Sequence, residues 1–279
     1  MVCRPICESL DHRAVSGVPR PASTICLVRD TPQCAEVLMV RRTPQARFMG
    51  GAWVFPGGAV DPTDEADAAR AAVSCSSPEM APWIAAAVRE LVEETGVWLL
   101  ESGAIVTSNR PSGAAVFDDI LQHDEHFAGE SVLYFANWIT PEPLPVRFDT
   151  RFFASTVPPG LDPAVDRIEL VEARWIRPGD ALELAGTGRW DIAFPTRKIL
   201  EFLEAFDTAA LLYEHIQRQP AVETIQPRLA TVDGRVAILM PGDPGFEDAA
   251  SRESDPAFLA EIENGIRSRA ETAPEIRAP

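Results

Sequence analysis

The chain has 279 residues, with 42 acidic against 25 basic side chains and a formal net charge of −17. This acidic balance argues against a general nucleic-acid-binding protein, because phosphate backbones attract basic surfaces. Runs of apolar residues are too short for a membrane span, and the N-terminus lacks the hydrophobic stretch of a secretory signal. The five cysteines are irregularly spaced, which argues against a zinc site and fits a reducing compartment. We therefore expect a cytoplasmic protein without a nucleic-acid or membrane partner.

The first part of the chain is predicted to hold an arm followed by two strands. Residues 1–20 are polar and punctuated by proline, which is typical of an N-terminal arm. Residues 22–29 and 36–41 are predicted strands on either side of a turn at Thr31-Pro32-Gln33. Residues 51–54 then lead into a glycine-rich turn.

That turn, Phe55-Pro56-Gly57-Gly58, follows the pair Gly50-Gly51. Paired glycines permit positive φ and a close approach of the backbone to a ligand. The next segment, residues 61–77, is rich in Ala, Ser and Asp, and it predicts an exposed loop with a short helix over 64–72.

A longer helix is predicted to follow and to end at Gly96, where a left-handed glycine is common. Its start is expected at Ser77-Pro78, or at a capping box formed by Ser76 and Glu79. Residues with helical spacing form its inward stripe: Ile84, Val88, Leu91, Val92 and Thr95.

The rest of the chain alternates predicted strands with predicted helices. The strands are 96–100, 132–139, 152–156 and 169–175, and the helices are 117–127, 178–185 and 195–209. Strands interleaved with helices on both faces predict an α/β/α sandwich.

We expect one domain over residues 21–215 and a C-terminal extension over 216–279. The extension is predicted to hold a hairpin of residues 228–230 and 236–240 around Asp233-Gly234. The charged tail beyond Asp248 is predicted to be partly helical, over 256–268, and partly disordered.

Three carboxylates on the long helix carry the main chemical signal. Glu90, Glu93 and Glu94 are spaced i, i+3 and i+4, so they share one helical face, and Arg89 can brace Glu93 from one turn earlier. Clustered carboxylates repel one another, and oxygen ligands are preferred by Mg²⁺ and Mn²⁺, which often bridge to phosphates. The alternative is a solvated acidic face; the neighbouring glycine turn favours the metal site.

These residues resemble the signature of the Nudix hydrolases. The run R-E-L-V-E-E-T-G-V, from Arg89 to Val97, matches the second half of that signature, and Gly58 matches its opening glycine. Gly58 and Arg89 are 31 positions apart (89 − 58), about 17 more than in the family pattern. The signature's first, mainly structural glutamate falls on Ala81, so Glu79 or Asp64 is left as its substitute.

The resemblance implies a Nudix α/β/α sandwich with a mixed sheet, and a metal-dependent hydrolase. The implied cofactor is Mg²⁺ or Mn²⁺, held by Glu90, Glu93, Glu94 and the carbonyl of Gly57. The implied catalytic residues are Glu93, Glu94 and Arg89. The general base is left open between a glutamate of the signature helix and two residues before Trp175, with Glu169 as the main candidate and Glu172 as the other.

A second motif resembles the coenzyme A diphosphatase subgroup, whose members also carry an insertion inside the signature. From Leu38 to Gly58 its spacing is followed, and the implied substrate-binding residues are Arg41, Arg42, Arg47 and Gly51. Independently of the family, residues 37–60 contain no acid, and arginine forks suit phosphates. The resemblance covers about residues 21 to 205.

The favoured reaction is therefore cleavage of coenzyme A or acyl-coenzyme A to 3′,5′-ADP and a 4′-phosphopantetheine product. Two alternatives stay open: a Nudix hydrolase acting on ADP-ribose, NADH or another dinucleotide, and a non-catalytic nucleotide sensor. The intact E-x-x-E-E pattern disfavours the sensor. The resemblance also implies a homodimer as a possible assembly.

Overall fold

The computed structural model describes residues 17–46, 49–108, 110–144, 146–165, 167–232, 235–252 and 256–257. Its contacts divide the chain into two compact units. The larger unit comprises Pro21–Asn137 and Thr150–Glu223; the smaller one takes in Trp138–Asp149 and the described residues at both ends of the chain. Most of the predicted N-terminal arm, residues 1–16, lies outside the described part.

A twisted sheet forms the centre of the larger unit, in the order β7-β8-β1-β2-β3. Strand β4 pairs with β1, and β9 pairs with the other long central strand, β2. The bounds are β1 (Arg20–Asp30), β2 (Ala35–Arg42), β3 (Trp53–Val54), β4 (Gly57–Ala59), β7 (Leu133–Ile139), β8 (Phe148–Thr156) and β9 (Leu170–Ile176).

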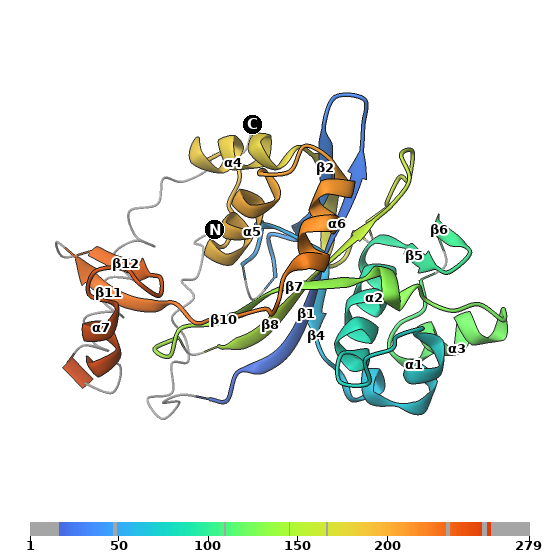
Figure 1. The fold of residues 1–279 in the computed structure, drawn as a ribbon, viewed down its shortest axis with the longest axis horizontal. Helices are drawn as coiled ribbons and strands as arrows, with labels where there is room; N and C mark the ends of the chain where they lie inside the picture. The colour runs from blue at the N-terminus through green and yellow to red at the C-terminus, as the bar shows by residue number, and fades with distance from the viewer. Residues whose placement is uncertain are drawn as a thin grey trace. The chain divides into compact units, whose positions relative to one another are not determined.

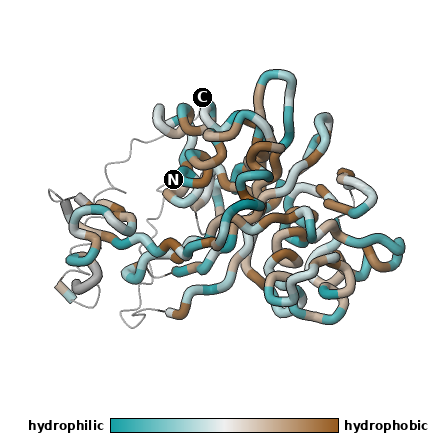
Figure 2. Tube along the Cα trace, viewed as in Figure 1, coloured by the Kyte–Doolittle hydropathy of each residue, from teal (hydrophilic) through white to brown (hydrophobic). Residues whose placement is uncertain are grey.

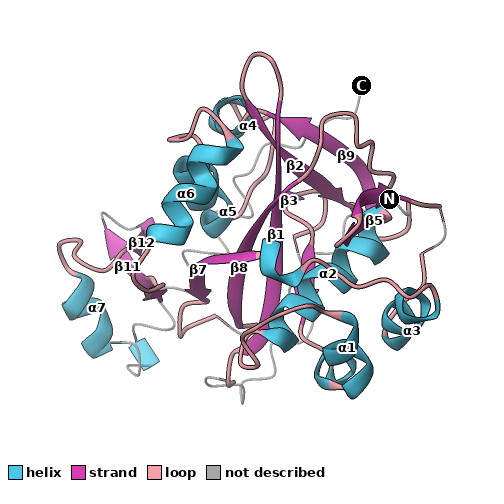
Figure 3. Ribbon diagram, turned by 45° about the vertical axis from the view of Figure 1, so that its right-hand side comes forward, coloured by secondary structure: helices cyan, strands magenta, loops and turns pink. Residues whose placement is uncertain are grey.

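Helices lie on both sides of this sheet, as Figures 1 and 3 show. One group is α1 (Asp67–Ala72), α2 (Ala81–Thr95) and α3 (Ala114–Gln122). The other is α4 (Pro178–Gly186), α5 (Phe194–Leu203) and α6 (Ala209–Arg218). The predicted α/β sandwich with a mixed sheet is confirmed.

The central strands are buried on both faces because helices cover both. In β1, Ile25 and Leu27 pack into the same cluster as Ile84, Val88 and Leu91 of α2, all at most 4% exposed. The alternate side chains point to the opposite face, so the strand reads as a nearly continuous buried run. Figure 2 shows hydrophobic stretches along these strands, interleaved with hydrophilic ones.

The inserted segment is not the exposed loop that its composition predicted. It folds into a 3-10 helix, η1 (Pro62–Glu65), followed by α1, the short helix expected over 64–72. Ala69, Ala72 and Val73 are buried in the main core cluster. Small alanine side chains allow α1 to pack closely on its neighbours, so a composition typical of a loop here serves a packed helix.

The signature helix begins later than predicted. Residues 78–80 form a turn in which the carbonyl of Ser77 accepts hydrogen bonds from the backbones of Met80 and Ala81, and α2 starts at Ala81. Pro82 therefore takes the first-turn position that was assigned to Pro78. The end at Gly96 is confirmed, with φ 69°, and every residue of the predicted inward stripe is buried.

Three other predictions in the larger unit change in detail. Strand β5 (Val97–Leu100) was predicted, but it pairs with an unexpected β6 (Gly103–Val106) in a separate two-stranded sheet. Helix α3 starts and ends earlier than the predicted 117–127. The single helix predicted over 195–209 is two helices, because Thr208 adopts an extended conformation and caps α6 through the backbone N–H of Leu211 (3.3 Å). A 3-10 turn, η2 (Gly129–Ser131), precedes β7.

The smaller unit contains the predicted hairpin. Strands β11 (Arg228–Val232) and β12 (Arg235–Leu239) pair antiparallel, with Leu229 opposite Ile238; β10 (Thr224–Ile225) precedes them and α7 (Phe246–Arg252) follows. The turn residues Asp233-Gly234 and nearly all of the predicted helix 256–268 lie outside the described residues. In the described part, no helix is long and apolar enough to cross a membrane.

Candidate active site

The glycine turn lies against β1 and touches α2 through two carboxylates. Gly57 is the register partner of Thr24, and a Cβ at position 57 would lie within 3.0 Å of the backbone of β1. Its N–H donates to Oε2 of Glu94 (3.1 Å). A Cβ on Gly58 would lie within 3.0 Å of the Glu90 carboxylate. Gly57 is therefore required where the turn meets the backbone of β1, and a side chain at position 58 would displace the Glu90 carboxylate.

Arg89 is the hub of the acidic face. Its side chain is 5% exposed, and its Nε and Nη2 donate to the two carboxylate oxygens of Asp64 (2.8 and 3.0 Å). Nη2 also donates to the carbonyl of Ala59 (3.0 Å), while Nη1 donates to Glu90 (2.8 Å) and lies 3.4 Å from Glu93. Burial alone would lower the pKa of Arg89, but these carboxylates outweigh it and raise that pKa, so the guanidinium stays charged. Arg89 thus holds the acidic side chains in place.

Asp64 takes the place opposite Arg89 that the sequence left open. Position 81, where the signature has glutamate, is an alanine, and the alternatives were Glu79 and Asp64. Glu79 is exposed, whereas Asp64 is fully buried on Arg89. The inserted segment therefore supplies the buried carboxylate that pairs with Arg89.

Glu93 has a partner that sequence reasoning missed. The backbone N–H of Gly113 donates to its Oε1 (2.7 Å). Gly113 is the N-cap residue of α3 and has φ 56°. The sequence signal for this contact is a glycine directly before a helix. Because the helix was predicted to start at residue 117, Gly113 was not recognised as its N-cap.

Burial dominates the electrostatics of the other two glutamates. It raises the pKa of Glu94 well above its usual range, and the charge of Glu90 adds to this. The Gly57 N–H and Arg42 oppose that rise, while Glu169 strengthens it. The pKa of Glu90 is also raised, because its burial outweighs the attraction of Arg89. Two carboxylates are thus held at some electrostatic cost in the metal-free protein.

The donor set fits a hard divalent cation, although the carboxylates are not gathered around a common point. Across the described ranges, no three His, Cys, Asp or Glu side chains are close enough together to hold an ion. In this arrangement Arg89, Gly57 and Gly113 hold the oxygens of Glu90, Glu94 and Glu93. The candidate ligands are all oxygen, and a cation would offset the burial and the repulsion by Glu90 that raise the pKa of Glu94.

Two of the predicted arginines end β2, and one of them, Arg42, acts on the acidic face. Arg41 donates from Nε to the carbonyl of Gly51 (3.3 Å), so these two predicted residues are in contact. The charge of Arg42 acts on Glu94, and its Nε is buried without a hydrogen-bond partner among the described residues. Arg47 lies outside the described residues.

The two candidate bases are separated by their surroundings. Strand β9 pairs with β2, and the N–H of Thr43 donates to the carbonyl of Glu169 (2.8 Å), which places Glu169 beside Arg42. Glu169 is also close enough to affect the pKa of Glu94. Glu172 instead forms an exposed ion pair with Arg174 (2.8 Å). The geometry thus brings Glu169, rather than Glu172, to the acidic face.

The whole chain was compared with known proteins. No protein-family model matches the chain. The Caenorhabditis elegans protein named "Putative nudix hydrolase 7" is 32% identical over 193 residues, which cover 65% of this chain. The match spans 59% of that relative's length. The crystal structure of a NUDIX hydrolase from Alicyclobacillus acidocaldarius shares 28% identity at a TM-score of 0.61, covering 71% of this chain and 96% of that one.

Fold and site define an α/β sandwich protein with an acidic helix braced against a glycine turn. The chain is thus similar, in sequence and in fold, to proteins named as Nudix hydrolases.

Proposed function

We propose that this protein hydrolyses a diphosphate bond in a nucleoside diphosphate derivative, with Mg²⁺ or Mn²⁺ as cofactor. The observation that carries the proposal is the position of Glu94, which is buried, bound to the Gly57 N–H and flanked by the charges of Glu90 and Arg42. A buried carboxylate between another carboxylate and an arginine is the kind of environment found at functional sites.

The proposed roles follow from the contacts. Glu90, Glu93 and Glu94, with the carbonyl of Gly57, would hold the cation. The bound cation would neutralise charge on the diphosphate and lower the pKa of the attacking water. Arg89 orients the carboxylates, as its hydrogen bonds to Glu90 and Asp64 support.

The reaction is an in-line displacement at phosphorus. Water attacks one phosphorus atom, a new P–O bond forms, and the P–O bond of the anhydride breaks, which releases two phosphorylated products. Glu169, or a glutamate of α2, accepts the proton of the water. The protein contributes positioning and electrostatic stabilisation, as is general for phosphoryl transfer.

Coenzyme A or acyl-coenzyme A is the proposed substrate, giving 3′,5′-ADP and (acyl-)4′-phosphopantetheine. This part rests on the motif around Arg41, Arg42, Arg47 and Gly51. The contact of Arg41 with Gly51 supports it, and so does the buried Nε of Arg42, because an anionic group would give that donor a partner.

A hydrolysis panel tests the proposal. Coenzyme A esters, ADP-ribose, NADH and dinucleoside polyphosphates are offered with Mg²⁺, with Mn²⁺ and with a chelator. We expect metal-dependent cleavage of coenzyme A, and a loss of at least about 100-fold in kcat for Glu93→Gln and Glu94→Gln. Glu101→Gln, an exposed acid beyond α2, is the matched control and should leave the rate unchanged.

The same panel tests the proposed substrate separately from the proposed reaction. Arg42→Ala should lose coenzyme A cleavage, whereas the exposed control Arg70→Ala should not. A preference of the wild type for ADP-ribose would contradict coenzyme A as the substrate, but it would agree with metal-dependent hydrolysis of a diphosphate bond. Binding of nucleotides without cleavage of any would contradict the enzyme and favour a sensor.

A further inference from the structure

The inserted segment between the glycine turn and α2 reaches the acidic face through one buried contact. Asp64 is 0% exposed, and both of its carboxylate oxygens bind the guanidinium of Arg89, at 2.8 and 3.0 Å. Such two-point contact between an arginine and a carboxylate fixes the plane of the guanidinium as well as its position. The orientation of Arg89 is therefore set from the inserted segment.

Asp64 is itself held by the cap of η1. The Asp61 side chain accepts the N–H of Thr63 (3.0 Å), and the Asp61 N–H donates to Oδ2 of Asp64 (2.8 Å). These reciprocal bonds form a capping box, and Pro62 sits in the first turn of the 3-10 helix. The capped 3-10 helix therefore holds the Asp64 carboxylate in a fixed orientation toward Arg89.

The other side of the guanidinium meets the proposed metal ligands. Nη1 donates to Glu90 (2.8 Å) and lies 3.4 Å from Glu93, and Nη2 donates to the Ala59 carbonyl of β4 (3.0 Å). A single rigid group thus joins the inserted segment, the strand of the glycine turn and two carboxylates of α2. A change in its tilt would alter its contacts with both Glu90 and Glu93.

We propose that Asp64 is a positioning residue for the metal ligands, so that the inserted segment is a working part of the site. The proposal rests on the proposed function, because it assigns Glu90 and Glu93 to the cation. Asp64 acts through Arg89 and touches neither cation nor substrate. If Asp64 served only to neutralise a buried arginine, its loss would lower stability without changing metal affinity in the folded protein.

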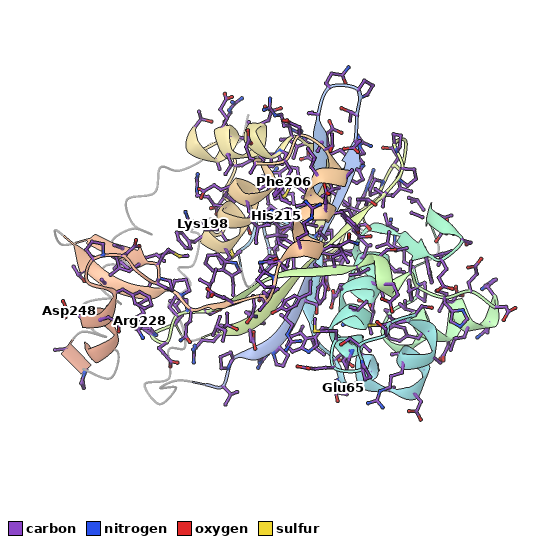
Figure 4. The ribbon with its side chains drawn as sticks, in the orientation of Figure 1. Glu65, Lys198, Phe206, His215, Arg228 and Asp248 are labelled. Atoms are coloured by element: carbon purple, nitrogen blue, oxygen red, sulfur yellow. The ribbon has the colours of Figure 1, made fainter. Side chains whose placement is uncertain are left out.

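The experiment measures Mn²⁺ binding by the full chain, from the electron paramagnetic resonance signal of free Mn²⁺. It compares the wild type with Asp64→Asn and with Glu65→Gln, at a temperature where circular dichroism shows each protein folded. Glu65 is the neighbouring acid of η1 and is exposed; it is labelled in Figure 4. Asparagine keeps the volume of Asp64 and removes its charge.

We expect Asp64→Asn to raise the Kd for Mn²⁺ by about 10- to 100-fold, the usual effect of losing a partner that orients metal ligands. Its kcat should fall while its KM changes little, and Glu65→Gln should match the wild type. A folded Asp64→Asn protein with the wild-type Kd would overturn the proposal.

If Asp64→Asn does not fold, Asp64→Glu decides. It keeps the negative charge beside Arg89 but shifts the carboxylate by one methylene group, so weaker Mn²⁺ binding by the folded protein supports the proposal and the wild-type Kd overturns it. A wild type that binds Mn²⁺ but cleaves nothing in the panel would overturn the proposed function alone. The role of Asp64 would still be tested by comparing the Kd values of the wild type and the variant.

Discussion

At the scale of single residues, the proposed metal ligand Glu94 lowers the stability of the metal-free protein when it is charged. Burial and the neighbouring charge of Glu90 raise its pKa well above the usual 4.5. Between that usual value and the raised one, the folded metal-free protein binds more protons than the unfolded chain. Its stability therefore falls as the pH rises through this window. The raised pKa of Glu90 acts in the same direction.

Replacing Glu94 with glutamine should therefore stabilise the metal-free protein while it abolishes turnover. We expect a gain of about 1 to 2 kcal/mol at pH 8, the scale on which a buried polar group without full compensation costs stability. The gain should shrink towards pH 5. Urea unfolding with a chelator at both pH values measures it, and Glu101→Gln is the exposed control. A Glu94→Gln protein less stable than the wild type at pH 8 would contradict this account.

The sequence identified the residues of the acidic face better than their partners. The spacing of Glu90, Glu93 and Glu94 is local, so a helical period predicts their common face. The contacts of Asp64 with Arg89 and of Gly113 with Glu93 join positions 25 and 20 residues apart. Such contacts depend on how the inserted segment and α3 pack, which no local period encodes.

At the scale of elements, types were easier to predict than boundaries. Long apolar runs identified β1, β2 and β7, because a strand buried on both faces has few polar positions. The start of α2 was misplaced, since Ser77-Pro78 has the composition of a helix start but forms a preceding turn. The inserted segment was misread because alanine is common both in exposed loops and in closely packed helices.

The C-terminal cap of α2 gives a prediction at this scale. Gly96 has φ 69°, and a Cβ there would lie within 3.0 Å of the Thr107 carbonyl. Gly188 has a similar φ of 73°, with open space around it. Gly188→Ala should cost about 1 to 2 kcal/mol for backbone strain alone, and Gly96→Ala clearly more, because the carbonyl must also move. Equal losses in urea unfolding would refute the close contact.

At the scale of the whole molecule, all of the described candidate site residues belong to the larger unit. The smaller unit has its own apolar cluster, in which Leu229 is 4% exposed and packs with Leu144, Val236 and Ile238. Its stability and the chemistry of the site should therefore respond to different substitutions.

Leu229→Ala tests this division. It should destabilise the hairpin by about 2 to 3 kcal/mol through loss of buried contacts, and speed amide hydrogen exchange over residues 228–239. Hydrolysis and Mn²⁺ binding should stay at wild-type levels. Leu211→Ala, at a side chain that is 49% exposed, is the control with little effect on either. A fall in kcat for Leu229→Ala would show that the units do not act separately.

The contacts of Arg89 have a consequence for how the protein matures. With Asp64, Glu90 and Glu93 around it, this arginine is an internal counter-ion that stands in for part of the charge of a cation. The acidic helix can then fold before any metal is bound, unlike small domains that need metal to fold. Assembly of the protein and supply of its proposed cofactor would then be separate events, so newly made chains would not need to compete for free metal.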